Sequence, residues 1–140
     1  MALPHFSIIV TTHNRARLLQ RCLRSILANT FTDHEVILVA DHPDPATHAT
    51  ATELLRPQDT FVRRPAGGGP AQSRNLGLRM TRGKHVLFID DDDAFLPTYF
   101  AEMHAATLVH PGHAIFTNPR VIEEDRSQPE LVPLKVTCLL

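Results

Sequence analysis

Cysteine is scarce in this sequence, and the little present excludes several classes of protein. The two cysteines, Cys22 and Cys138, lie far apart and form neither a C-x-x-C motif nor a zinc-ligand spacing. The pair gives no sign of an oxidising compartment. Cys22 falls within an apolar helical pattern, so we expect it to be a buried thiol.

Long apolar runs and an excess of one charge are also absent. No apolar stretch approaches the roughly 20 residues that span a bilayer. The opening MALPHFSIIVTTHN lacks the basic start of a signal peptide, and no N-x-S/T sequon occurs. The formal net charge of -1 argues against a general polyanion binder, so we expect no nucleic-acid partner. These absences predict a soluble cytoplasmic protein or module without a transmembrane segment.

What the sequence does contain is a regular alternation of strands and helices. Its 140 residues, 43% of them hydrophobic, suffice for one domain with a real core. Apolar runs predict strands over 6–10, 35–40, 60–64, 84–90 and 114–118, and helical spacing predicts helices over 15–28, 46–55, 70–81 and 96–109. Asn14 and Asp44 are the expected helix caps. This order predicts an α/β fold with a parallel, doubly wound sheet and helices on both faces.

Four consecutive aspartates, Asp90 to Asp93, follow the fourth predicted strand, at the sheet edge where such folds bind ligands. In extended backbone Asp90 and Asp92 point to one side, and Asp91 and Asp93 to the other. Neighbouring carboxylates disfavour joint ionisation unless a cation is present. Hard oxygen ligands suit Mg²⁺ or Mn²⁺, which also hold substrate phosphates. The pattern therefore favours a metal–diphosphate site, although a solvated acidic turn would have the same sequence.

A glycine-rich loop, residues 67–69, precedes another predicted helix. Its glycines permit close backbone approach, and the free N–H groups at the start of the helix could face an anion. Arg74 and Asn75 lie one turn inside this helix. A plain flexible loop is the alternative interpretation.

Asp41 closes the second predicted strand and lies at the same edge of the sheet. Its carboxylate could accept hydrogen bonds from a base or a ribose hydroxyl, or it could be an ordinary turn residue. His13 and His42 lie at this rim too and could touch a ligand.

In this order and spacing, the pieces resemble the nucleotide-sugar-binding half of the family 2 glycosyltransferases, which have the GT-A fold. The segment FSIIVTTHNRARLLQ is similar to the family's first strand and helix, and EVILVADHP to its second strand. The segment GGGPAQSRNLGLRMTRGKHVLFIDDDD resembles the family's A-R-N-x-G helix, K-G cap and D-x-D strand end. The resemblance covers about residues 4–118. Thr11 and His13 stand where the family usually has proline and tyrosine, Ala40 where it often has an acidic residue or asparagine, and Ser73 where alanine is common.

The resemblance implies a Rossmann-like, mainly parallel sheet and transfer of a sugar from a nucleotide diphosphate to an unknown acceptor. A UDP-sugar is the favoured donor and Mn²⁺ or Mg²⁺ the cofactor. Asp41 would hold the base, and the metal ligands would be Asp90 and Asp92 with help from Asp93. The residues expected to bind the nucleotide sugar are Thr11, His13, Asn14, Asp41, Arg74, Asn75, Asp90 and Asp91.

The family also implies that the base that deprotonates the acceptor lies in a further half, which forms the acceptor site. We therefore expect residues 1–120 to be a donor-binding core and residues 121–140 an incomplete acceptor-side segment or tail. The catalytic base is then unknown, and this chain alone would have impaired or no activity. Apolar surface left where the other half would pack could drive homo-oligomer formation.

Two other interpretations of these motifs stay open. The chain could be a non-catalytic nucleotide-sugar-binding module or a fragment. It could also be a phosphohydrolase with an aspartyl nucleophile, which likewise needs D-x-D after a buried strand. That chemistry places the motif on the first strand, with Thr or Val where this sequence has Ala94.

Overall fold

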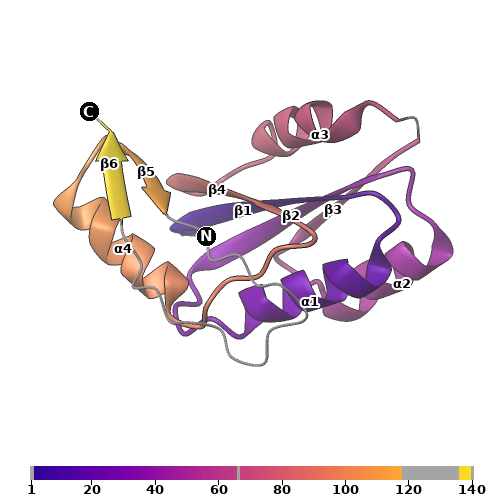
Figure 1. The fold of residues 1–140 in the computed structure, drawn as a ribbon, viewed down its shortest axis with the longest axis horizontal. Coiled ribbons are helices and arrows are strands. Elements are labelled where there is room, and N and C mark those ends of the chain that lie inside the picture. Colours follow the sequence, from indigo (N-terminus) through magenta and orange to yellow (C-terminus); the bar gives the residue numbers. More distant parts are fainter. Residues whose placement is uncertain (1, 66, 118–135, 140) are drawn as a thin grey trace, which may run out of the picture. The chain divides into compact units, whose positions relative to one another are not determined.

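The protein has an α/β fold built on a four-stranded parallel sheet. The computed structural model describes residues 2–65, 67–117 and 136–139, and the chain divides into two compact units, residues 1–99 and 100–140. In the first unit the sheet has the order β3-β2-β1-β4, and every neighbouring pair is parallel. Helices α1 and α2 cover one face of this sheet and α3 covers the other (Figure 1). The predicted fold class is therefore confirmed. The element bounds are β1 (Phe6–Thr12), α1 (Ala16–Leu27), β2 (His34–Asp41), α2 (Pro45–Leu54), β3 (Thr60–Arg64), α3 (Gly69–Leu78) and β4 (His85–Asp90).

The two central strands are buried along their whole length, because helices pack on both of their faces. Every residue of β1 and of β2 is buried, which explains why both read as nearly continuous apolar runs. On the α3 face, Ile9, Ile37 and Val39 form the core. Helix α3 approaches closely at Gly77, where an added Cβ would lie 2.7 Å from a methyl carbon of Ile9.

Helix α1 presents an apolar stripe to the sheet. Leu19, Cys22, Leu23 and Ile26 recur at helical spacing and are all buried. The predicted buried thiol is thus confirmed, and burial raises the pKa of Cys22 to about 12.

The two predicted helix caps have different outcomes. Asp44 caps α2 as expected, since its carboxylate accepts a hydrogen bond from the Thr47 N–H at 2.8 Å and Pro45 follows. The predicted Asn14 cap of α1 is wrong: Arg15 is the N-cap residue, and no side chain caps the helix. Asn14 instead has a positive φ of 51° and accepts a hydrogen bond from the Asp44 N–H at 2.8 Å. It therefore joins the loop after β1 to the start of α2.

The remaining elements are α4 (Tyr99–Val109), β5 (Ala114–Thr117) and β6 (Val136–Leu139). The sequence placed the strand near residue 114 in the parallel sheet; within the described residues, β5 pairs with β6, antiparallel. Residues 118–135 lie outside the description, so the predicted boundary near residue 120 stays a prediction. Among the described helices, none has the length and apolar character needed to cross a membrane.

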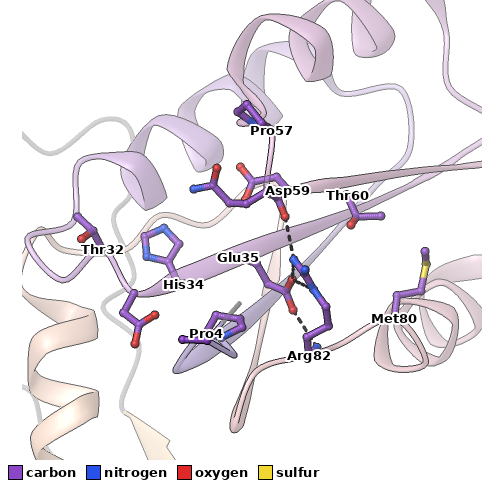
Figure 2. A pocket seen from close by; sticks show the side chains of 12 residues that line it. Pro4, Thr32, His34, Glu35, Pro57, Asp59, Thr60, Met80 and Arg82 are labelled. Carbon is purple, nitrogen blue, oxygen red and sulfur yellow. Dashed lines mark hydrogen bonds and ion pairs between the residues drawn. The ribbon is translucent and has the colours of Figure 1, made fainter.

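At the amino ends of the strands, a buried carboxylate ties three segments together beside a cavity of about 650 Å³ (Figure 2). Glu35, 1% exposed, accepts hydrogen bonds from the Ser7 hydroxyl at 2.6 Å and the Arg82 N–H at 2.8 Å. The guanidinium of Arg82 pairs with its other oxygen at 2.7 Å. The Ser7 hydroxyl also accepts the Gly83 N–H at 2.8 Å. Only glycine fits there, because a Cβ would lie 2.5 Å from the Ser7 backbone nitrogen.

We expect Glu35→Gln to lower the free energy of unfolding by about 2–3 kcal/mol, because the amide would turn a donor toward donors that now bond a charged acceptor. Denaturant unfolding measures this loss. The matched control is Glu53→Gln, whose ion pair with Arg24 is 61% exposed on both sides and spans 3.8 Å; it should change stability by about 0.5 kcal/mol or less. Equal effects of the two substitutions would contradict the structural role of Glu35.

His34 should make stability depend on pH. Burial, and then the charge of Arg56, lower its pKa below the ordinary 6.5. The unfolded chain therefore takes up a proton first as the pH falls, so stability should decline from about pH 6.5 down to the lower folded pKa. The drop in Tm between pH 7.5 and 5.5 should shrink in His34→Gln but not in His48→Gln, an exposed control. An unchanged drop in His34→Gln would refute this assignment.

Candidate functional site

The predicted site residues come together at the carboxyl edge of the sheet. Strands β2 and β3 extend from one side of β1, and β4 pairs on the other side, so the strand order reverses between β1 and β4. Open parallel sheets bind ligands beyond the strand ends at such a switch point. Thr11 lies in register with Asp90 there, and its hydroxyl lies 3.3 Å from a carboxylate oxygen of Asp90. Asp41 ends the neighbouring strand β2.

Three of the four consecutive aspartates form a compact cluster. Asp90, Asp92 and Asp93 each offer a carboxylate oxygen, and these oxygens lie within 4.8 Å of one another. The Asp93 N–H donates to the Asp90 carbonyl at 3.1 Å, which closes the turn that gathers them. Burial and the neighbouring charges of Asp92 and Asp90 raise the pKa of Asp93. Ligands about 2.0–2.6 Å from one ion lie up to about 4–5 Å apart, so the cluster fits a divalent cation.

Asp91 differs from the other three because its carboxylate is fully buried. One of its oxygens accepts the Thr12 hydroxyl at 2.6 Å and the Arg15 Nε–H at 3.2 Å. The other oxygen accepts Nη2 of the same guanidinium. Asp91 thereby fixes the acidic turn to the end of β1 and the start of α1. Its predicted contact with the nucleotide sugar stays a prediction.

Arginines supply the counter-charges of this rim. Arg74 Nη2 donates to Asp90 at 2.6 Å, and Arg15 Nη1 donates to Asp92 at 3.0 Å. Arg21 donates to the backbone carbonyl of Asp92. Asp90 and Asp92 are therefore each paired with a guanidinium, and a bound cation would have to replace these contacts.

Asp41 is held by the glycine-rich loop. Its Oδ2 accepts the Gly68 and Gly69 N–H groups at 3.2 and 3.3 Å, and Arg64 lies 3.8 Å from its Oδ1. Burial alone would raise the pKa of Asp41, but these hydrogen bonds and the charge of Arg64 together lower it. Its buried Oδ1 accepts no hydrogen bond within the described residues. The anion that the loop N–H groups face is thus Asp41 of the chain itself.

The other candidate residues follow β1 and β2 or lie on α3. His13 is exposed beyond β1, and Asn75 is exposed on α3. The side-chain oxygen of Asn14 accepts a hydrogen bond from the Asp44 N–H. His42 has a positive φ of 50°, and its Nδ1 lies 3.1 Å from the Pro65 carbonyl. The binding roles of His13, Asn14 and Asn75 remain predictions.

Three arginines at this edge, Arg15, Arg21 and Arg64, had no predicted role. Arg15 and Arg21 fall within the helix predicted over 15–28, and Arg64 ends the strand predicted over 60–64. Arg15 lies shortly after the end of β1, and Arg64 ends β3, so both lie at the same edge of the sheet as the aspartates. The rule that located the aspartates could therefore have located these arginines.

Comparison with known proteins assigns the family. The family model described as glycosyl transferase family 2 matches residues 7–134, so the chain belongs to glycosyltransferase family 2. One relative is the GalNAc(5)-diNAcBac-PP-undecaprenol beta-1,3-glucosyltransferase of Campylobacter jejuni, 34% identical over 97 residues. This match covers 67% of this chain and 31% of that protein.

Solved structures show the same fold. S. aureus TarS, residues 1–349 in complex with UDP-GlcNAc, matches with a TM-score of 0.74 at 24% identity, covering 89% of this chain and 37% of that one. The mannosyltransferase PcManGT of Pyrobaculum calidifontis, in complex with GDP-Man and Mn²⁺, matches with a TM-score of 0.67 at 23% identity. That match covers 82% of this chain and 35% of that one. The chain thus spans about a third of the length of these proteins.

Proposed function

We propose that this chain is the donor-binding part of a glycosyltransferase and binds a nucleoside diphosphate sugar together with a divalent cation. The observation that carries the proposal is the cluster of Asp90, Asp92 and Asp93 at the switch point of a family 2 chain. The solved structure of PcManGT in complex with GDP-Man and Mn²⁺ supports a divalent cation in a protein of the same fold.

The three clustered aspartates are the proposed cation ligands. A cation held there would neutralise charge on the diphosphate as the bond to the sugar breaks. The cluster lies where Arg74 also points, so the same guanidinium could donate to a phosphate oxygen once it leaves Asp90. Thr11, at the end of β1, lies beside Asp90 and completes the proposed diphosphate side of the site.

Asp41 is the proposed acceptor for the base. Its Oδ1 is buried without a hydrogen-bonded partner among the described residues, and such an atom favours a ligand that brings a donor. The N3–H of uracil is such a donor, which supports a UDP-sugar as the donor substrate. TarS, with the same fold, was crystallised with UDP-GlcNAc. We assign no residue of this chain as the base that deprotonates the acceptor.

The two other interpretations gain less support. An aspartyl phosphohydrolase would need the D-x-D motif on its first strand, whereas Asp90 ends β4 and the chain belongs to a glycosyltransferase family. A non-catalytic binding module would share the donor site. Sugar transfer or donor hydrolysis by the purified chain distinguishes this module from an enzyme.

The proposed site predicts metal-dependent nucleotide binding. In calorimetric titrations with UDP, GDP and dTDP, Mn²⁺ should strengthen binding, and UDP should bind best. Asp92→Asn should weaken binding in the presence of Mn²⁺ by about tenfold or more, because a cation ligand is lost. The control Asp33→Asn alters an exposed acid at the amino end of β2 and should change nothing. Equal binding with and without Mn²⁺ would contradict the metal site.

Asp41 should act on the base and not on the diphosphate. Asp41→Asn should weaken UDP binding by about tenfold or more, because a hydrogen bond to a charged acceptor is worth about 1.5–3 kcal/mol. Inorganic pyrophosphate with Mn²⁺ is the matched control ligand, and its affinity should be the same in both proteins. Parallel losses for UDP and pyrophosphate would show that Asp41 shapes the whole loop instead of reading the base.

A further inference from the structure

One guanidinium, that of Arg15, bridges two carboxylates of very different burial. Nε and Nη2 face the two oxygens of Asp91, whose side chain is 0% exposed. Nη1 donates to Asp92 at 3.0 Å, and the Asp92 side chain is 47% exposed. The pairing with Asp91 is bidentate, so it fixes the plane of the guanidinium as well as its position.

The contact with Asp91 is the one that must persist. Asp91 is a buried charge, and removing its counter-ion would leave that charge unpaired in the interior. The Thr12 hydroxyl at 2.6 Å adds a second fixed bond to the same carboxylate. Arg15 therefore stays on Asp91, and its Nη1 is held facing the acid cluster.

The contact with Asp92 is the one that can be exchanged. It lies in partly exposed surroundings, where an ion pair contributes little. Asp92 is also one of the three proposed cation ligands, so a carboxylate oxygen held by Nη1 has to be released or shared when a cation arrives. After that exchange, Nη1 keeps its direction and has an N–H group available for a different oxygen.

We infer that Arg15 is a positioning residue that couples cation binding to diphosphate binding. This inference rests on the proposed function. Without nucleotide, Arg15 orients Asp92 and opposes the cation by occupying its ligand. A diphosphate beside the cation supplies a new acceptor for Nη1, so the cation binds more tightly in its presence. The roles of Asp90, Asp92 and Asp93 as ligands do not by themselves require this coupling.

The test measures Mn²⁺ binding by the loss of the free-ion electron paramagnetic resonance signal, with and without UDP. Arg15→Gln alone would leave the buried Asp91 carboxylate without its counter-ion. The test therefore uses the double variant Arg15→Gln/Asp91→Asn, which removes one charge of each sign. It should bind Mn²⁺ alone about two- to fivefold more tightly than the wild type, since an exposed ion pair no longer opposes the ion. The tightening of Mn²⁺ binding by UDP should shrink by a similar factor.

A second variant and a control distinguish the loss of the bridging contact from a simple loss of positive charge. Arg15→Lys keeps the charge on Asp91, but an ammonium group cannot span both carboxylates. It should shift Mn²⁺ affinity in the same direction as the double variant. Arg24→Gln removes an exposed charge of α1 that pairs with Glu53 of α2, and it should leave Mn²⁺ affinity unchanged.

The outcomes separate this inference from the proposed function. If the wild-type chain binds no Mn²⁺ even with UDP, the proposed metal site is wrong and the inference falls with it. If the wild type binds Mn²⁺ but both Arg15 variants bind it equally or more weakly, Arg15 does not oppose the cation and only this inference is overturned. A loss of folding in the variants would not tighten Mn²⁺ binding, so the expected sign cannot come from structural damage.

Discussion

The buried carboxylate of Asp91 is the constraint on which the rim of this sheet depends. A charge with no exposed surface must be paired, and the chain pairs it with the Thr12 hydroxyl and the Arg15 guanidinium. Thr12 ends β1, Arg15 precedes α1, and Asp91 follows β4. One ion pair therefore joins the two strands that flank the switch point. Because Asp91 directly precedes Asp92 and Asp93, this ion pair also fixes where their turn begins.

Charge balance explains how four adjacent carboxylates can share one turn. Four adjacent carboxylates would repel one another strongly if left alone. Arg15 and Arg74 pair with three of them, and Arg21 binds the turn through the Asp92 carbonyl. Burial and the neighbouring charges of Asp92 and Asp90 raise the pKa of the fourth, Asp93. The arginines thus hold the rim in a form that a cation and a diphosphate could enter together. The cation would replace an arginine beside an aspartate, and the diphosphate would become the new partner of that arginine.

The fold could be predicted from the sequence because its signals are local and repeated. Buried parallel strands such as β1 and β2 read as continuous apolar runs, and α1 has a clear apolar stripe. The predicted strands also placed the aspartates, since open parallel sheets bind ligands beyond the carboxyl ends of their strands. The antiparallel pairing of β5 could not be predicted, because an apolar run of four residues carries no information on its partner.

The parts of the site that escaped prediction are those decided by tertiary contacts. Asn14 is a good capping residue by type, yet its oxygen is used by the Asp44 N–H, which comes from a loop 30 residues away. The glycine loop was expected to face a ligand anion, but Asp41 reaches its N–H groups first. Four aspartates in a row look equivalent in a sequence, whereas in the fold one is buried and three are gathered at the surface. The buried one, Asp91, is held by Thr12 and by Arg15, and Arg15 lies 76 residues before it in the chain. Because the long-range pair sets which acids face outward, the chemistry of the motif belongs to the β1–β4 junction and not to the aspartate run alone.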